Sequence, residues 1–166
     1  SILINFIFII FFFIFCLALL IFSNFVHLKT MIFIIILTCI ASDIGGFIFG
    51  NIFKGAKLTK ISPNKTISGA IGSIIFSCVT YFFAIFYLTN NLSIVILVVA
   101  ISISIACQAG DLFFSYLKRK SFLKDTGNLL PGHGGVLDRI DGILLGLPMG
   151  LITLLLINLS IWTKKD

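Results

Sequence analysis

The chain has 166 residues, of which 59% are hydrophobic and 11% charged, and its net charge is +6. Soluble domains have about 45–50% apolar residues even with glycine counted, and about 25% charged residues. A chain of this size has too little interior to bury so much apolar surface, which excludes a soluble enzyme, a disordered tail and an extracellular disulfide scaffold. The composition predicts a protein that crosses a lipid bilayer several times.

Five segments have the roughly 20 mostly apolar residues that a membrane crossing requires. In chain order they cover residues 2–22, 30–49, 67–88, 93–113 and 142–162. Because an open strand edge cannot be left in lipid, each must be a helix. We therefore expect an all-α polytopic bundle, a single membrane domain over residues 1–166. The chain begins at Ser1 without an initiator methionine, so we also expect a processed or truncated N-terminus that lacks some spans.

The basic residues lie between the apolar segments. Alternating spans place loops 50–66 and 114–141 on one side, and these loops carry nine of the twelve Lys and Arg residues. The positive-inside rule then orients both loops toward the cytoplasm. We interpret the positive charge as topology signalling and contact with lipid headgroups, and expect no nucleic-acid partner. The four cysteines lie inside apolar runs, without paired metal-ligand spacing, and are expected to be small buried hydrophobes.

Carboxylates at the cytoplasmic ends of the spans are the first candidate for chemistry. Asp138 and Asp141 are three residues apart, so both point to one face if they begin the last helix. A helix dipole alone also favours acids in a first turn, and this alternative stays open. Asp111 ends the fourth span, where a carboxylate needs a cation or water. Convergence of these three would create a hard oxygen site suited to Mg²⁺. Asp43, near the end of the second span, is a further candidate ligand.

Cations and glycines surround these acids. Arg and Lys side chains bind phosphate, and close-spaced glycines let backbone N–H groups approach an anion. The basic candidates are Lys118, Arg119, Lys124 and Arg139, and the loop candidates are His133, Gly134 and Gly135. A tight turn is the plain alternative for the glycines. His133 could donate to phosphate, relay a proton or stabilise that turn.

The loop before the third span carries a second polar motif, SPNKTISG at residues 62–69. Ser62 and the following proline are typical of a helix N-terminus, with Ser62 as the N-cap. Lys65 and Thr66 could instead hold a phosphate at the helix N-terminus. Spacing alone does not separate the two interpretations.

Residues 115–141, SYLKRKSFLKDTGNLLPGHGGVLDRID, resemble the signature of the phosphatidate cytidylyltransferase family, also called CDP-diacylglycerol synthases. The SPNKTISG motif is similar to the family's Ser-Pro-x-Lys-Thr element, and Asp43 with its following glycines to an Asp-containing segment. The resemblance covers roughly residues 40–145. This chain departs from the family at Phe114, where Glu is usual, at Ser68, where an acid is common, and at Asn51, where a basic residue is frequent.

The resemblance implies an all-helical bacterial inner-membrane enzyme whose site faces the cytoplasm. It would condense CTP with phosphatidic acid to give CDP-diacylglycerol and pyrophosphate, using Mg²⁺ with a monovalent cation such as K⁺. A homodimer is compatible with it. By motif match it assigns metal binding to Asp111, Asp138 and Asp141. Nucleotide or phosphate contacts would fall to Lys118, Arg119, Lys124 and His133, with Ser62, Lys65 and Thr66 from the other loop.

Two other functions fit parts of the pattern. A cation or phosphate transporter would use Asp43 and Asp111 as intramembrane ligands, with acids along a path through the bilayer. A lipid or polyprenol kinase would use a nucleoside triphosphate and a metal in the same way but transfer the γ-phosphoryl group. Release of pyrophosphate separates cytidylyl transfer from the kinase reaction.

Overall fold

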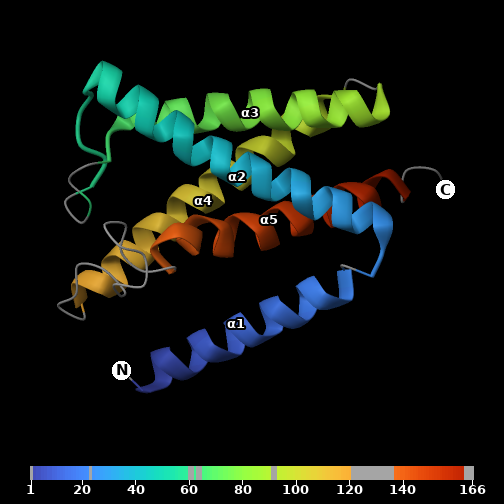
Figure 1. The fold of residues 1–166 in the computed structure, drawn as a ribbon, viewed down its shortest axis with the longest axis horizontal. Helices are drawn as coiled ribbons and strands as arrows, with labels where there is room; N and C mark the ends of the chain where they lie inside the picture. Colours follow the sequence, from blue (N-terminus) through green and yellow to red (C-terminus); the bar gives the residue numbers. More distant parts are fainter. Residues whose placement is uncertain are drawn as a thin grey trace. The chain divides into compact units, whose positions relative to one another are not determined.

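In the computed structural model, the described residues form five α-helices (Figure 1). The structure describes residues 2–22, 24–59, 62, 65–90, 93–120 and 137–162, without the side chains of residues 2–5, 7–9, 18, 22, 137–139 and 158–162. In chain order the helices are α1 (Ile2–Phe22), α2 (Val26–Phe53), α3 (Ile67–Thr89), α4 (Ile94–Lys120) and α5 (Leu137–Trp162). The prediction of an all-α protein is confirmed.

Four of these helices are long and apolar enough to cross a membrane: α2, α3, α4 and the Ile140–Ile157 part of α5. Five spans were predicted. The segment 2–22 is helical as predicted, and α1 is 21 residues long. Among the described residues its apolar stretch covers Ile10–Ile21, and a fifth crossing by α1 stays a prediction. The described part of the chain is thus a helical membrane protein with four candidate spans.

Three helices extend beyond their predicted spans, and α5 does so by beginning at Leu137 instead of residue 142. α4 continues past residue 113 through Lys118, Arg119 and Lys120, because cations interact favourably with the negative end of a helix. α2 continues to Phe53 and ends before Lys54, whose φ of 40° is left-handed. These extensions carry the helices into the segments that were expected to be loops.

The chain divides into two compact units, Ser1–Phe33 and Ile34–Asp166. The second unit contains the rest of α2 together with α3, α4 and α5. Within it, the end of α2, the start of α3, the end of α4 and the start of α5 lie toward one end (Figure 1). This arrangement agrees with the prediction that the two long connections share a side.

Glycines let the helices of the second unit approach closely. A Cβ built on Gly45 of α2 would lie 2.6 Å from the carbonyl oxygen of Gly72 on α3. A Cβ built on Gly110 of α4 would lie 2.7 Å from the carbonyl oxygen of Asp141 on α5. Real Cβ atoms do not approach carbonyl oxygens this closely, so only glycine permits these backbones to touch. The second contact brings the residue after Gly110, which is Asp111, beside α5.

Apolar side chains and thiols fill the interior of the second unit. The buried side chains include Ile35 and Cys39 of α2, Ile103 and Cys107 of α4, and Leu144 of α5. The prediction of small buried hydrophobes is confirmed for these two free cysteines, whereas Cys16 and Cys78 are only half-buried. The buried hydroxyls of Ser42 and Ser104 lie 3.0 Å apart and hydrogen-bond α2 to α4, so these polar groups have a partner inside the bundle.

The close α2–α3 contact predicts that Gly72→Leu destabilises the protein. The added side chain has no space against α2, and overpacking of this kind costs about 1–3 kcal/mol. Val79→Leu on the same helix is the control, because Val79 is 50% exposed. Thermal unfolding in detergent should show a lower midpoint for Gly72→Leu alone, and equal midpoints would contradict the contact.

Candidate functional site

An ion pair between Lys65 and Asp111 lies at the centre of the site. The Lys65 Nζ atom is 2.6 Å from Asp111 Oδ2, and the two side chains are 29% and 23% exposed. Lys65 precedes α3, whereas Asp111 lies on α4, 46 residues later. Since both groups are largely shielded from water, their attraction is screened less than that of a surface pair.

Backbone hydrogen bonds hold Lys65 in place. Its carbonyl oxygen accepts from the Leu58 N–H at 2.7 Å, and its own N–H donates to the Ser62 carbonyl at 3.1 Å. Thr66, the next residue, is the N-cap of α3, and its Oγ1 accepts from the Gly69 N–H at 3.1 Å. The motif does start the helix, but the cap is Thr66, and not Ser62 with the following proline as the sequence suggests. The cap directs the preceding lysine toward α4.

Asp141 reaches the same place from the first turns of α5. Its Oδ1 accepts from the Gly142 N–H at 2.9 Å, and its Oδ2 lies 3.9 Å from Lys118 Nζ. A Cβ on Gly142 would be only 3.0 Å from Asp111 Oδ1, so the absence of a side chain there lets α5 lie against Asp111. The Asp111 and Asp141 carboxylates are close enough to repel one another when both are charged. Positive charge is therefore favourable at this place, and Lys65 and Lys118 supply part of it.

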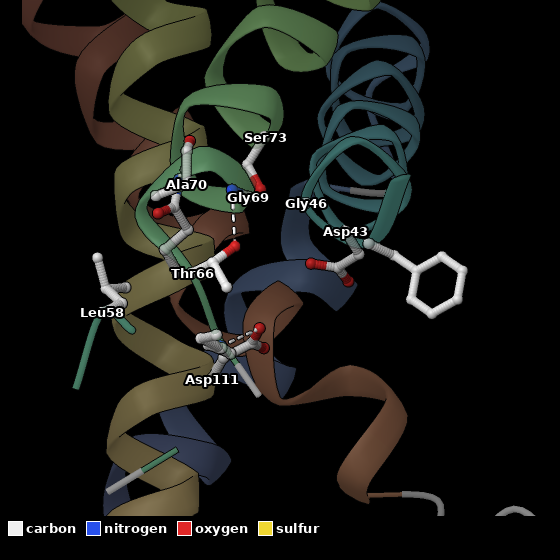
Figure 2. Close-up of a pocket in the computed structure, with 11 residues that line it drawn as sticks. Asp43, Gly46, Leu58, Thr66, Gly69, Ala70, Ser73 and Asp111 are labelled. Atoms are coloured by element: carbon white, nitrogen blue, oxygen red, sulfur yellow. Dashed lines mark hydrogen bonds and ion pairs between the residues drawn. The ribbon is translucent and has the colours of Figure 1, made fainter. Parts of the chain in front are cut away.

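Two cavities meet at the Lys65–Asp111 pair. The first, of about 230 Å³, is lined by residues of α2, α3 and α4, including Thr66, Ser73 and Gln108. The second, of about 340 Å³, lies among α2, α4 and α5 and is lined by Asp141, Ser115 and three isoleucines. Asp43, Lys65 and Asp111 line both cavities. Figure 2 shows the carboxyl groups of Asp43 and Asp111 pointing toward the space between them.

Sequence reasoning missed Gln108, which lies one turn before Asp111. Its Nε2 donates to the Ala70 carbonyl and to Ser104 Oγ, each at 3.3 Å, and so ties α4 to α3. Ser104 in turn bonds Ser42 of α2. The available signal was a single Gln inside an apolar span, three residues before an acid. Gln108 and Ala70 line the first cavity, and the two serines lie in the bundle behind Gln108.

The structure brings together several of the predicted site residues and leaves others untested. Asp43, Lys65, Thr66, Asp111 and Asp141 line the two cavities. Lys118 is the neighbour of Asp141 described above. The Ser62 backbone carbonyl supports Lys65, and Arg119 is exposed near the end of α4.

The remaining predicted residues lie outside what the structure describes. They are Lys124, His133, Gly134 and Gly135, and the side chains of Asp138 and Arg139. Asp138 and Arg139 do lie in the first turn of α5, as expected. Phe114, which replaces the Glu usual in the resembled family, is 5% exposed and belongs to the core.

The carboxylates of the site are suitable ligands for a divalent cation such as Mg²⁺, but the described ones are not gathered tightly. Among the residues that are described, no group of three or more His, Cys, Asp or Glu side chains is gathered tightly enough to hold a metal. Three carboxylates nevertheless line one cavity, and carboxylate oxygen is the ligand that Mg²⁺ prefers. The Lys65 ammonium already occupies a cation position at Asp111.

Comparison with known proteins gives consistent matches. The cytidylyltransferase family matches residues 1–157. A phosphatidate cytidylyltransferase of Staphylococcus haemolyticus is 45% identical over 120 residues, covering 71% of this chain and 45% of that protein. Those of Helicobacter pylori and Rickettsia felis are each 41% identical, over 131 and 123 residues, covering 78% and 67% of this chain and 48% and 53% of theirs. The chain spans about half the length of the curated relatives it matches.

The N-cap of α3 predicts different effects for two substitutions of Thr66. Thr66→Ser keeps the hydroxyl that accepts from the Gly69 N–H, whereas Thr66→Ala removes it and should destabilise the protein by about 1 kcal/mol. Thermal unfolding in detergent measures the difference. A serine variant as unstable as the alanine variant would show that the hydroxyl does not act as a cap.

Proposed function

This chain belongs to the cytidylyltransferase family, and we propose that it transfers a cytidylyl group from CTP to phosphatidic acid, giving CDP-diacylglycerol and pyrophosphate. The observation that carries the proposal is the convergence of Asp43, Asp111, Asp141 and Lys65 on adjoining cavities at one end of a membrane bundle. These four residues come from α2, α4, α5 and the loop before α3. The names of the relatives support the same activity.

The residue types suit chemistry on phosphates. In the proposed reaction, a phosphate oxygen of phosphatidic acid attacks the α-phosphorus of CTP in line, and the bond to pyrophosphate breaks. The attacking phosphomonoester has a second pKa of about 6, by analogy with phosphorylated side chains, so it is largely ionised near neutral pH. The site therefore needs no strong general base. Its task is to position two anions against each other and to neutralise their charge.

Mg²⁺ is the proposed cofactor, with a monovalent cation such as K⁺ beside it. Asp111, Asp141 and Asp138 would hold the divalent ion, with Asp43 as a further carboxylate on the cavity wall. When bound, such an ion neutralises phosphate charge and orients substrate and leaving group.

Basic side chains would bind the remaining phosphate oxygens. Lys65 and the N-terminus of α3 line the first cavity, where the lysine charge and the helix dipole favour an anion. Lys118 lies by Asp141 on the other side. The residues proposed to assist them are Arg119, Lys124, His133, Gly134, Gly135 and Arg139.

The location of the site suits one lipid and one water-soluble substrate. The second cavity is lined by Ile40, Ile44 and Ile143 as well as by charged groups, so an acyl chain and a phosphate could both find suitable contacts there. By the positive-inside rule, the site would face the cytoplasm from a bacterial inner membrane. A homodimer remains a prediction.

The positions of the charges favour an enzyme over a transporter. In the second unit, the acids described within candidate spans gather around the two cavities at one end, whereas a conducted ion needs polar groups along its whole path. A lipid kinase would use a similar site. The products separate it from the proposed reaction.

The direct test incubates membranes that contain this chain with α-labelled CTP, phosphatidic acid and Mg²⁺. The proposal predicts label in the lipid extract and release of pyrophosphate. Asp141→Asn should lower this turnover by about 10²–10³-fold, the effect of losing one group that stabilises transition-state charge. Asp166→Asn, a matched substitution at the last residue, should leave the turnover unchanged.

Each alternative outcome has a clear meaning. Unlabelled phosphorylated lipid with release of CDP would indicate a kinase and overturn the proposal. Wild-type turnover in Asp141→Asn would show that Asp141 has no part in the reaction.

A further inference from the structure

Lys65 holds the same carboxylate that the proposed function assigns to the metal. Its Nζ lies 2.6 Å from Asp111 Oδ2, in direct hydrogen-bonding contact with that oxygen. The described cations near the carboxylates are Lys65 at Asp111 and, at the longer distance of 3.9 Å, Lys118 at Asp141. One oxygen of the proposed metal ligand is thus already bonded to an ammonium group, while Asp111 Oδ1 faces Gly142 of α5.

We infer that Lys65 is an internal cation that occupies Asp111 in the empty site, competes there with the divalent metal, and turns to a substrate phosphate once the metal has bound. This inference rests on the proposed function. It assigns Lys65 two successive partners, Asp111 and phosphate.

The competition follows from charge and distance. A divalent cation bound to Asp111 would lie within a few ångströms of the Lys65 ammonium, and like charges that close repel strongly in a half-buried site. The two carboxylate oxygens could accept both cations, but this repulsion weakens metal binding for as long as the ammonium stays at Asp111. Because Asp43 and Asp141 line the same cavity, the ammonium lowers the repulsion among the carboxylates while the metal is absent.

The local structure allows the side chain to move while its backbone stays fixed. The Lys65 backbone is held by Leu58 and Ser62, and the Thr66 cap starts α3 immediately afterwards. Rotation about the side-chain bonds is therefore sufficient, and such rotamer changes are fast. Lys65 lines both cavities, so its ammonium can leave Asp111 and still face bound substrate.

This exchange couples the binding of the metal ion to the binding of a substrate phosphate. A metal ion alone must displace Lys65 without giving it a new partner. A metal ion that arrives with a phosphate supplies that partner, so the pair is bound better than the ion alone. By linkage, the same coupling makes phosphate bind better when the metal is present.

The test measures divalent-metal affinity without nucleotide, using Mn²⁺ and electron paramagnetic resonance on the purified full chain in detergent. Lys65→Met removes the competing charge and keeps an unbranched side chain. It should bind Mn²⁺ at least about tenfold more tightly than the wild type, a change of about 1.4 kcal/mol. Lys65→Arg keeps the charge and should bind much as the wild type does.

Lys57→Met is the matched control, because Lys57 is an exposed lysine in the same loop. It should leave Mn²⁺ affinity within about twofold of wild type, which excludes a general effect of net charge on a screened surface. Equal or weaker binding by Lys65→Met overturns the inference. Absence of Mn²⁺ binding in every variant overturns it together with the metal assignment.

The outcomes for the proposed function remain separate. Tighter Mn²⁺ binding by Lys65→Met in a protein that makes no CDP-lipid would support the exchange and contradict cytidylyl transfer. If the wild type makes CDP-lipid and Lys65→Met has the same Mn²⁺ affinity as the wild type, the exchange is contradicted and cytidylyl transfer is supported.

Discussion

A carboxylate at the edge of a membrane needs a cation, and this constraint organises the second unit of the protein. Little water is available at that depth to solvate a charge, so an isolated Asp111 on α4 would be unfavourable. The Lys65 ammonium meets it at 2.6 Å from a loop that is distant in sequence. This contact ties the start of α3 to α4. It also places a mobile positive charge among carboxylates whose chemistry depends on cations.

The scaffold makes this arrangement possible through small residues. Glycines at the α2–α3 and α4–α5 contacts let backbones touch where side chains would keep them apart. The α4–α5 contact has a direct functional consequence, since Gly110 precedes Asp111 and Gly142 follows Asp141. Their missing side chains bring the two carboxylates to one cavity. Hydroxyl and amide groups behind them, Ser42, Ser104 and Gln108, bond one another within the bundle.

Hydropathy and charge were sufficient to predict most of the fold. Lipid requires long apolar helices, so the four spans of α2 to α5 follow from composition. Asp43 and Asp111 stood out because charge near the end of a span demands an explanation, and Asp141 because it lies three residues from Asp138. All three of Asp43, Asp111 and Asp141 line one cavity. α1 is helical over the whole predicted segment 2–22, and its crossing of the membrane stays a prediction.

What could not be predicted depends on contacts between distant segments. The motif left open whether Ser62 and its proline start a helix or Lys65 and Thr66 bind phosphate. The structure gives Thr66 the cap and Lys65 the bond to Asp111. Nothing in one sequence indicates which of nine cations on that side pairs with which acid. The end of α4 was misplaced because its basic residues were assigned to a loop, although they stabilise a helix C-terminus.

Diffraction from crystals soaked in Mn²⁺ tests the central claim most directly, because the anomalous signal locates the ion and the density locates Lys65. The account predicts an anomalous peak between the carboxylates of Asp111 and Asp141, with the Lys65 ammonium turned away from Asp111. A peak elsewhere, or Lys65 still bonded to Asp111 with the ion in place, would contradict it.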